Sequence, residues 1–227
     1  MREIVFDTET TGLDPHTGDR MVEIGCIEIV NRMPSGRRYH AYFNPDRDMP
    51  MEAERVHGLS ATFLASKPRF TEKVLELLDF IEDSPLVAHN AQFDFGFLNF
   101  ELGQCGHPLV CTTRMVDTVV LARQRHPGAK HSLDALCSRY GIDRSHRVLH
   151  GALLDAELLA QVYVELCGGR QIGLDLAAEA ERQVVAIAEF RPATGRFRAA
   201  RPHAANADEL ARHQAFLQSL NISAWAR

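Results

Sequence analysis

Three segments near the start of the chain each predict a β-strand, the first two because they are rich in apolar residues and the third because apolar and polar residues alternate in it. The segments are residues 2–8, residues 21–30 (MVEIGCIEIV) and residues 37–45 (RRYHAYFNP). Pro34, Ser35 and Gly36 predict the turn that joins the second segment to the third. We therefore expect the chain to open with an antiparallel meander of three strands.

Helical spacing and short apolar runs follow. Val74, Leu77 and Ile81 recur on one face, so residues 70–83 are expected to form an amphipathic helix. The other expected elements are a buried strand at 85–90, a helix at 93–102, a strand at 113–118, and helices at 118–125, 132–141 and 152–166. Strands first, and then strands that alternate with helices, predict a mixed α/β sheet flanked by helices.

The pattern weakens after Gly169. Residues 189–206 contain two prolines, one glycine and four arginines among few apolar residues, which indicates a linker. Helical spacing returns over residues 207–220, with Asn206 as the expected N-cap. We expect a domain at 1–169, a linker at 170–205 and a C-terminal helix at 206–227, so that the domain is followed by a flexible tail that ends in a helix.

Composition narrows the class of protein. A chain of 227 residues, 45% of them hydrophobic, can bury a full globular core. The net charge of −5 means that no overall positive field attracts nucleic acid to the protein. A bound metal ion could still supply positive charge locally. Five cysteines without a Cys-x-x-Cys pair predict reduced thiols. With no apparent signal peptide and no apolar run long enough to span a membrane, we expect a cytoplasmic protein without membrane contact.

Two acids end the first apolar run. Alternate side chains of a strand share a face, so Asp7 and Glu9 point to the same side as Val5. One interpretation is a strand that runs out into solvent, with two acids in its turn. The other is a site at which further acids converge, and the chain offers two candidates for them.

The first candidate is Asp94, which follows the strand at 85–90 and opens a helix. An acid is favoured there by the helix dipole, which is the simpler explanation. Phe97 and Leu98 lie three and four residues further on, however, so Asp94 should lie on a face that looks inward.

The second candidate is Asp155, which shares a helical face with Leu159 and Leu166. An acid on a core-facing stripe is costly unless it is paired or binds metal, so the alternative is a buried salt bridge. On one continuous helix, His150 and Asp155 would diverge by about 140°. Gly151 therefore indicates that His150 lies on the loop before the helix. An ordinary exposed loop histidine is the alternative for it.

Four acids that point inward repel each other unless a cation lies among them. Carboxylate oxygens suit Mg²⁺ or Mn²⁺. Two such ions about 3.5–4 Å apart would activate a water and stabilise the leaving oxygen of a phosphodiester. His150 could take the proton from that water, because the pKa of a histidine lies near working pH.

Three motifs around these residues resemble those of the DEDDh 3′–5′ exonucleases. They read FDTETTG at 6–12, HNAQFD at 89–94 and HGALLD at 150–155. The segments similar to the epsilon proofreading subunits of bacterial DNA polymerase III are VHGLSATFL (56–64), HSLDALCSRYGI (131–142) and LHGALLDAELLAQVY (149–163). The resemblance covers residues 1–169 well and the tail to Arg227 more loosely.

The resemblance implies a ribonuclease H-like fold and a proofreading nuclease that acts on a single-stranded 3′ DNA end. It implies that two divalent ions, Mg²⁺ or Mn²⁺, are held by Asp7, Glu9, Asp94 and Asp155. His150 would be the general base. The residues expected to contact the terminal nucleotide are Asp7, Glu9, Glu52, His57 and Asp155.

A short pattern follows the catalytic domain. Gln171, Leu174 and Leu176 have a Q-x-x-L-x-L spacing. It resembles the motif by which bacterial replication proteins bind the sliding clamp. The alternative is a turn of ordinary amphipathic helix.

The tail resembles the polymerase-binding tail of epsilon subunits, so the catalytic subunit of DNA polymerase III is an expected partner. The expected contact residues are Leu210, Phe216, Leu217, Leu220 and Trp225. Aromatic anchors such as Trp225 often carry interface energy. The alternative is a C-terminal helix that packs on its own domain.

Two other functions compete with a proofreading subunit. A stand-alone DEDDh exonuclease could act on RNA ends or repair intermediates, but it would need neither a clamp motif nor a tethered helix. A non-catalytic scaffold between clamp and polymerase is disfavoured by the intact set of four acids and one histidine. The sequence leaves open which ion is used, whether RNA ends are cut, and whether a small accessory subunit binds.

Overall fold

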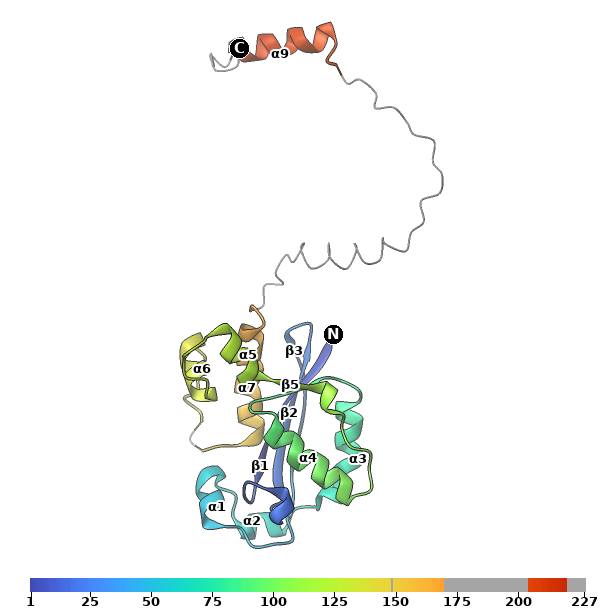
Figure 1. The fold of residues 1–227 in the computed structure, drawn as a ribbon, viewed down its shortest axis with the longest axis vertical. Coiled ribbons are helices and arrows are strands. Elements are labelled where there is room, and N and C mark those ends of the chain that lie inside the picture. The colour runs from blue at the N-terminus through green and yellow to red at the C-terminus, as the bar shows by residue number, and fades with distance from the viewer. Residues whose placement is uncertain (148, 170–203, 220–227) are drawn as a thin grey trace, which may run out of the picture. The chain divides into compact units, whose positions relative to one another are not determined.

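The computed structural model describes residues 1–147, 149–169 and 204–219. Within these ranges, five strands form one mixed sheet in the order β3-β2-β1-β4-β5 (Figure 1). Their bounds are β1 Arg2–Thr10, β2 Met21–Val30, β3 Met33–Tyr42, β4 Leu86–Ala88 and β5 Met115–Asp117. β1, β2 and β3 pair antiparallel, whereas β4 and β5 run parallel to β1. The predicted mixed sheet and its opening meander are confirmed.

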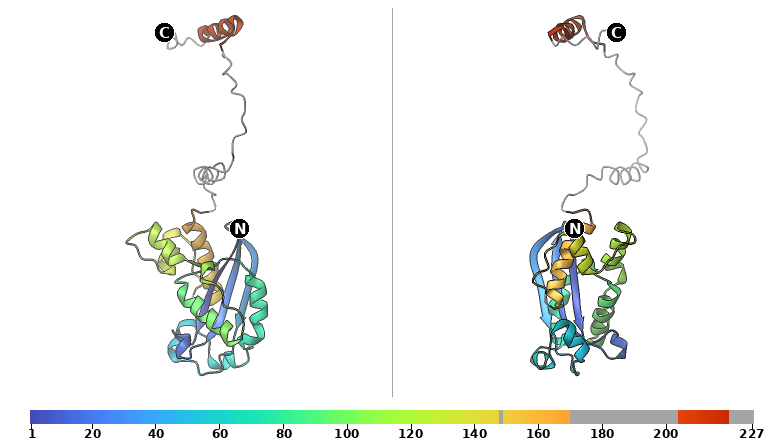
Figure 2. Two further views of the ribbon diagram at one scale, coloured as in Figure 1. Left: turned by 45° about the vertical axis from the view of Figure 1, so that its right-hand side comes forward. Right: turned by 90° about the vertical axis from the view of Figure 1, so that its left-hand side faces the viewer.

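Helices cover both faces of the sheet (Figure 2). Their bounds are α1 Met51–His57, α2 Ala61–Ala65, α3 Phe70–Ile81, α4 Gln92–Gln104, α5 Thr118–Arg125, α6 Leu133–Tyr140, α7 Ala152–Leu166 and α9 Ala207–Ser219. Two 3-10 turns are η1 Pro15–Thr17 and η2 Thr112–Arg114. Helices α3 to α7 and α9 occur within a few residues of their predicted positions. Helices α1 and α2 were not predicted, because each is too short to show a helical period.

β1 is buried on both faces, which explains its continuous apolar start. Ile4 and Phe6 pack with α3 and α4 on one face, while Val5 packs with α7 on the other. Asp7 and Glu9 continue the Val5 face, because side chains alternate along a strand. The strand therefore carries two acids to the α7 side of the sheet.

The turn between β2 and β3 lies earlier than the sequence predicts. Asn31 and Arg32 form it, with φ angles of 52° and 65°, and Val30 pairs with Met33. A two-residue hairpin turn of this hand needs positive φ at both positions, which asparagine tolerates well. Pro34 lies inside β3, an edge strand, which is where a sheet tolerates proline. The predicted Pro-Ser-Gly turn is therefore wrong.

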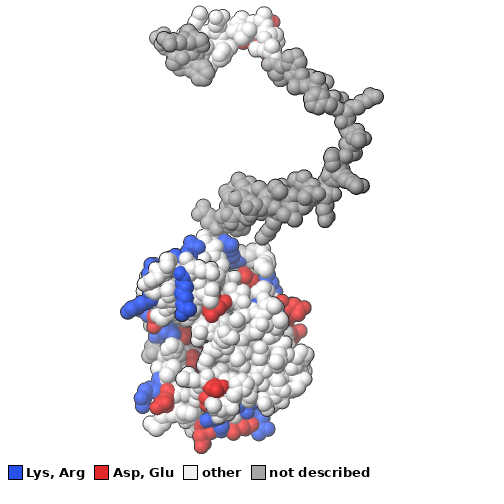
Figure 3. Space-filling view, in the orientation of Figure 1, with Lys and Arg blue, Asp and Glu red and all other residues white. Residues whose placement is uncertain are grey.

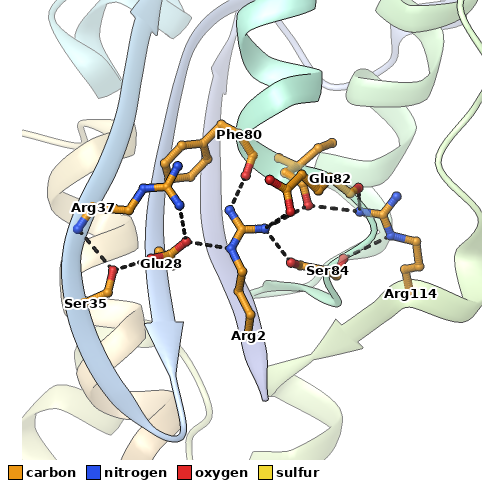
Figure 4. Close-up of polar contacts among 9 residues, drawn as sticks. Arg2, Glu28, Ser35, Arg37, Phe80, Glu82, Ser84 and Arg114 are labelled. Atoms are coloured by element: carbon orange, nitrogen blue, oxygen red, sulfur yellow. Dashed lines mark hydrogen bonds and ion pairs between the residues drawn. The ribbon is translucent and has the colours of Figure 1, made fainter.

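A polar network fastens the start of β1, at the end of the strand opposite its two acids (Figure 4). Arg2 donates to Glu28 Oε1 at 2.5 Å and to Ser84 Oγ at 2.6 Å. It also donates to the Phe80 carbonyl at 2.5 Å. Arg114 donates to the Ser84 carbonyl at 3.0 Å. These bonds hold β1 against β2 and against the loop between α3 and β4, so the strand is anchored at the end that carries no chemistry.

All five cysteines lie among the described residues, and each is a free thiol. The prediction of reduced thiols agrees with this finding. Across the described ranges, no helix has both the length and the apolar content that crossing a membrane requires.

The chain forms two units, Met1–Gly173 and Leu174–Arg227. In the second unit, α9 begins after Asn206, as the sequence predicts. Asn206 Oδ1 accepts from the backbone N–H of Glu209 at 2.9 Å, and Glu209 Oε2 accepts from the backbone N–H of Asn206 at 2.9 Å. This reciprocal pair is a capping box, which satisfies N–H groups at the start of the helix.

The residues expected to bind partners are described only in part. Leu210 and Phe216 are exposed on α9, and Leu217 is half-buried. Outside the described residues lie Gln171, Leu174, Leu176, Leu220 and Trp225. Their assignments to clamp and polymerase stay predictions.

Gly25 sets how closely α7 approaches the sheet, and this gives a first prediction. A Cβ atom at Gly25 would lie 2.3 Å from the backbone N and Cα of Leu153. Gly25→Ala should therefore push the start of α7 off β2 and displace Asp155, two residues further on. We expect a loss of about 1–3 kcal/mol of stability, as for other overpacked sites, together with a loss of nuclease activity.

Gly96→Ala is the matched control, because Gly96 is exposed on α4 and a Cβ there meets no heavy atom within 4 Å. It should leave activity unchanged and raise stability by up to about 1 kcal/mol, as alanine does in a helix. Denaturant unfolding and nuclease assays check both variants. Unfolding of Gly25→Ala at the wild-type midpoint would show that the contact with α7 is not tight.

Candidate active site

The end of β1 presents the first two acids beside a β-bulge. Asp7 pairs with Gly25 and Glu9 with Glu23, and the register shifts between Glu9 and Thr10. Glu9 is 8% exposed, so it is held at the edge of the core instead of running out into solvent. Bulges often re-aim side chains next to active sites. The interpretation of these acids as a solvent-exposed turn is therefore wrong for Glu9.

Asp94 lies in the first turn of α4, after β4 has ended beside β1. It is 3% exposed, and Phe97 and Leu98 on the same helix are buried, as expected. The Thr8 hydroxyl donates to Asp94 Oδ1 at 2.7 Å. Thr8 lies between the two acids of β1, so the strand that presents them also fixes this third carboxylate.

Asp155 and His150 come from the start of α7 and the loop before it. Asp155 is 3% exposed, and its backbone N–H donates to the Gly151 carbonyl at 2.9 Å. Gly151 caps the helix, so His150 lies on the preceding loop, as expected. The backbone N–H of His150 donates to the Val56 carbonyl at 3.2 Å, which ties this loop to α1. The imidazole itself is half exposed.

These side chains converge. Carboxylate or imidazole atoms of Glu9, His150 and Asp155 lie within 4.8 Å of one another. Asp7 lines a cavity of about 240 Å³ together with His150 and Asp155. Asp94 is close enough that its charge disfavours ionisation of both Asp7 and Glu9. The five residues expected to carry the chemistry therefore lie around one place at the end of the sheet.

Burial and mutual repulsion disfavour the charged forms of these acids. Removal from water, followed by repulsion from Glu23, raises the pKa of Glu9 to about 8. Burial raises the pKa of Asp94 to about 7, although the hydrogen bond from Thr8 lowers it. Desolvation and then repulsion from Asp94 and Glu9 raise the pKa of Asp7 well above its ordinary value.

This donor set fits divalent metal ions. Carboxylate oxygens are the hard ligands that Mg²⁺ and Mn²⁺ prefer. The raised pKa values of Asp7, Glu9 and Asp94 show that the protein alone does not balance their charges. A cation among them would supply that balance.

Arg147 compensates part of the charge. Its Nε donates to Asp155 Oδ1 at 2.5 Å, and its Nη2 donates to Asp155 Oδ2 at 2.7 Å. The same Nη2 lies 2.7 Å from His150 Nδ1, and Nη1 donates to Asp134 Oδ1 at 2.9 Å. The buried salt bridge considered as an alternative for Asp155 is therefore present. Nothing in the sequence marks Arg147, because a basic residue in a loop looks like a solvated one.

A second cavity of about 360 Å³ lies beside Glu9 and is lined by Glu52, His57 and Phe93, among others. His57 Nδ1 accepts from the backbone N–H of Leu59 at 3.0 Å, so the proton of the neutral ring is on Nε2. Nε2 is buried and has no partner among the described residues. Burial also lowers the pKa of His57, which keeps the ring neutral. His57 therefore lines the cavity as a neutral ring, and its Nε2 lies beneath the surface.

Charged side chains are distributed unevenly over the catalytic unit. Figure 3 shows Lys and Arg gathered over α5 and α6, whereas the area over α4 carries little charge. Arg123 and Arg125 lie in the last turn of α5, and Arg139 lies in the last turn of α6. On the face drawn, the described residues form no continuous basic band, which agrees with the net charge of −5.

The fold and the site together define a metal-dependent exonuclease, and comparison with known proteins agrees. The family model described as exonuclease matches residues 4–163. The structure of exonuclease X in complex with 5′ overhanging duplex DNA matches with a TM-score of 0.55 and 24% identity, over 73% of this chain and 90% of that one. The nuclease domain of 3′hExo, a DEDDh family member bound to rAMP, matches with a TM-score of 0.64 and 14% identity, over 74% and 92%. At these identities the likeness establishes the fold alone.

Relatives of higher identity are more specific. DNA polymerase III subunit epsilon of Rickettsia felis is 55% identical over 174 residues, which are 75% of this chain and 76% of that protein. The same subunit of Escherichia coli is 44% identical over 189 residues, 80% of this chain and 77% of that protein. The chain belongs to the exonuclease family and, within it, to the epsilon subunits of DNA polymerase III, which are 3′–5′ proofreading exonucleases. Divalent metal ions are the general cofactors of DEDDh exonucleases.

The raised pKa of Glu9 predicts how the stability of the folded protein depends on pH. Its pKa of about 8 in the folded protein exceeds its ordinary value of 4.5, so ionisation costs stability. That cost is absent below about pH 4.5 and grows as the pH rises toward 8. In EDTA, Glu9→Gln should therefore become progressively more stable than wild type between pH 5 and pH 8. We expect a difference of several degrees in Tm, since each kcal/mol moves the Tm of such a chain by about 2–4 °C.

Thermal unfolding at four pH values measures this difference. Glu76→Gln, which changes an exposed acid of α3 away from the site, is the control and should run parallel to wild type. Saturating Mg²⁺ should reverse the order, because glutamine is a weaker metal ligand than a carboxylate. A difference between Glu9→Gln and wild type that stays constant with pH would contradict the raised pKa.

Proposed function

We propose that Asp7, Glu9, Asp94 and Asp155 hold two divalent ions, Mg²⁺ or Mn²⁺, and that His150 is the general base of phosphodiester hydrolysis at a 3′ DNA end. The observation that carries this proposal is the convergence of the four carboxylates, three of them with raised pKa values, around one histidine. Such a cluster destabilises the protein unless a cation compensates it. The set of residues is therefore better explained by catalysis than by stability.

Each residue has a separate task in this mechanism. When bound, the ions would activate the attacking water and stabilise the leaving 3′ oxygen. His150 accepts the proton of that water at an imidazole nitrogen, for which its loop position leaves room. Thr8 keeps Asp94 in one orientation by its hydrogen bond. The backbone N–H of His150 donates to the Val56 carbonyl, which ties the loop to α1, and the N–H of Asp155 donates to the Gly151 carbonyl within the first turn of α7. Both bonds limit how far the base can move from the acids.

The cavity beside Glu9 suits the terminal nucleotide. Its volume of about 360 Å³ lies in the range of small-molecule sites. Glu52 and His57 line it, so both are available to a nucleotide whose phosphate lies at the acids. Phe93 adds an apolar wall for the base or the sugar.

We further propose that this chain is the proofreading subunit of a DNA polymerase III and binds its catalytic subunit. The names of its relatives support this, and one match, at 42% identity to the Pasteurella multocida subunit epsilon, extends over 97% of this chain and 89% of that protein. Leu210, Phe216 and Leu217 on α9 would contact the polymerase. Because these partners replicate DNA, we propose that the chain functions in the cytoplasm. A small accessory subunit is not needed for any part of the mechanism.

The proposed clamp contacts have separate support. Gln171, Leu174 and Leu176 come shortly after α7, which ends at Leu166, and keep the Q-x-x-L-x-L spacing. A short segment that binds a groove by a few apolar anchors needs little more sequence than this. We propose that these three residues bind the sliding clamp.

The test of the function uses one labelled primer in three forms with Mg²⁺: single-stranded, mispaired at the 3′ end, and fully paired. Chemistry at the phosphate does not read the base, so selectivity should come from melting the end, which costs a few kcal/mol and least at a mismatch. We expect the single strand to be cut fastest, the mispaired end next and the paired end slowest. Equal rates on the three substrates would remove the proofreading function.

His150→Gln is the control that separates chemistry from melting. It should slow all three substrates by about 10²–10⁴-fold and keep their order, because a general base acts after the end has melted. Asp7→Ala should abolish cutting altogether. If Asp7→Ala kept the wild-type rate in Mg²⁺, the metal assignment would be wrong.

The tail gives a further prediction, because every catalytic residue lies before Gly169. Residues 1–169 alone should keep the full rate on single-stranded DNA and no longer co-elute with the polymerase. In the full chain, alanine at Gln171, Leu174 and Leu176 should weaken clamp binding and leave polymerase binding intact. Gel filtration and titration with each partner measure these effects. Normal clamp binding by the triple variant would assign the segment to local structure.

A further inference from the structure

Arg147 holds two residues of the proposed active site at once. Its side chain is 10% exposed, although it comes from the loop between α6 and α7. Its Nε and Nη2 bind the two oxygens of Asp155, at 2.5 and 2.7 Å. Nη2 also reaches His150 Nδ1 at 2.7 Å, and Nη1 reaches Asp134 at 2.9 Å. A solvated basic side chain makes no such set of contacts.

The contact with His150 fixes the state of the imidazole. A guanidinium can only donate, so Nδ1 of His150 must accept from Arg147. The 3.2 Å approach of the same Nδ1 to Asp155 Oδ2 then joins two acceptors and is no hydrogen bond. With Nδ1 occupied by Arg147, that lone pair is not available to take a proton. The arrangement therefore represents a resting state of the active site, in which Nδ1 of His150 cannot act as the base.

The contact with Asp155 concerns the metal ions. Both oxygens of Asp155 face the guanidinium, in the bidentate geometry that suits a carboxylate best. A divalent ion needs a lone pair of the same carboxylate, and it would repel the guanidinium at close range. The position of Arg147 seen here and the binding of a metal ion to Asp155 therefore exclude each other.

We propose that Arg147 is a displaceable counter-ion of the metal site. It holds Asp155 and His150 together in the ion-free protein and passes to a phosphate of the DNA when ions are bound. The inference rests on the proposed metal site. Arg147 lines the cavity of about 240 Å³ that also contains Asp7, so a phosphate at the acids would lie within its reach. The planar fork that binds a carboxylate binds a phosphate equally well.

Arg144 provides a matched control in the same loop. Its Nη1 binds Asp134 Oδ1 at 2.8 Å, the oxygen that Arg147 also contacts. Among the described contacts, Arg144 has none with Asp155 or His150. Removing its charge therefore changes the net charge of the loop without freeing the metal ligands.

The first experiment titrates the full chain with MnCl₂ by calorimetry and by the paramagnetic resonance of unbound Mn²⁺. Arg147→Gln should bind Mn²⁺ about tenfold more tightly than wild type or more, because hydrogen bonds to charged groups no longer compete. Arg147→Lys, which keeps the charge but loses the fork, should fall between the two. Arg144→Gln should bind as wild type does. Circular dichroism verifies that each variant is folded.

The second experiment measures thymidine 5′-monophosphate binding in saturating Mn²⁺. Arg147→Gln should weaken this binding about tenfold, whereas Arg144→Gln should not change it. If Mn²⁺ binds more tightly but the nucleotide binds as before, the transfer to phosphate is wrong and the counter-ion role stands.

Failure of this inference is distinct from failure of the metal site. If Asp155→Asn binds Mn²⁺ as wild type does, the proposed site itself is wrong. If Asp155→Asn loses Mn²⁺ but Arg147→Gln gains no affinity, the metal site stands and Arg147 is not a competing counter-ion. Tighter Mn²⁺ binding by Arg147→Gln, with Arg144→Gln unchanged, is the result that supports the inference.

Discussion

The mutual repulsion of carboxylates held away from water is the constraint around which this domain is built. Glu9, Asp94 and Asp155 are each less than a tenth exposed, and they arrive from three different elements. To keep them together, β1 is anchored in apolar cores on both faces and by Arg2 at its far end. Gly25 lets the backbone of α7 approach the sheet. These contacts lie away from the acids and hold in place the elements that carry them.

Two features reduce the repulsion when no cation is bound, and they act on different acids. On β1 and α4, raised pKa values let Glu9 and Asp94 take up protons near neutral pH. Asp155 is instead paired with the guanidinium of Arg147 through both of its oxygens. Both features are reversible, which a metal site requires, because a proton and an arginine can leave a carboxylate whereas an apolar replacement cannot. The structure shows the salt bridge of Asp155, and on the proposed mechanism the metal ligand would be a second state of the same residue.

Periodic elements were predictable from the sequence, and contacts between loops were not. The strand that carries Asp7 and Glu9 and the helix that carries Asp155 have strong apolar patterns, so their faces follow from spacing alone. Helix α1 has seven residues and shows no period, so only the resemblance to known exonucleases suggested roles for its residues. Arg147 lies eight residues before Asp155, and no rule of spacing brings a loop residue back onto a helix.

The proposed chemistry also bears on how such a nuclease can select mispaired ends. Hydrolysis at a phosphate does not read the base, so discrimination between paired and mispaired ends would precede the chemistry. Melting a paired end costs a few kcal/mol more than fraying a mismatch, which alone gives a ratio of about 10 to 1,000 in the population of open ends. On the proposed role of the tail, a tether that raised the local concentration to about millimolar would increase the rate on both kinds of end equally. Recruitment would then set how often the nuclease samples the primer, while the stability of the terminal base pair would set what it removes.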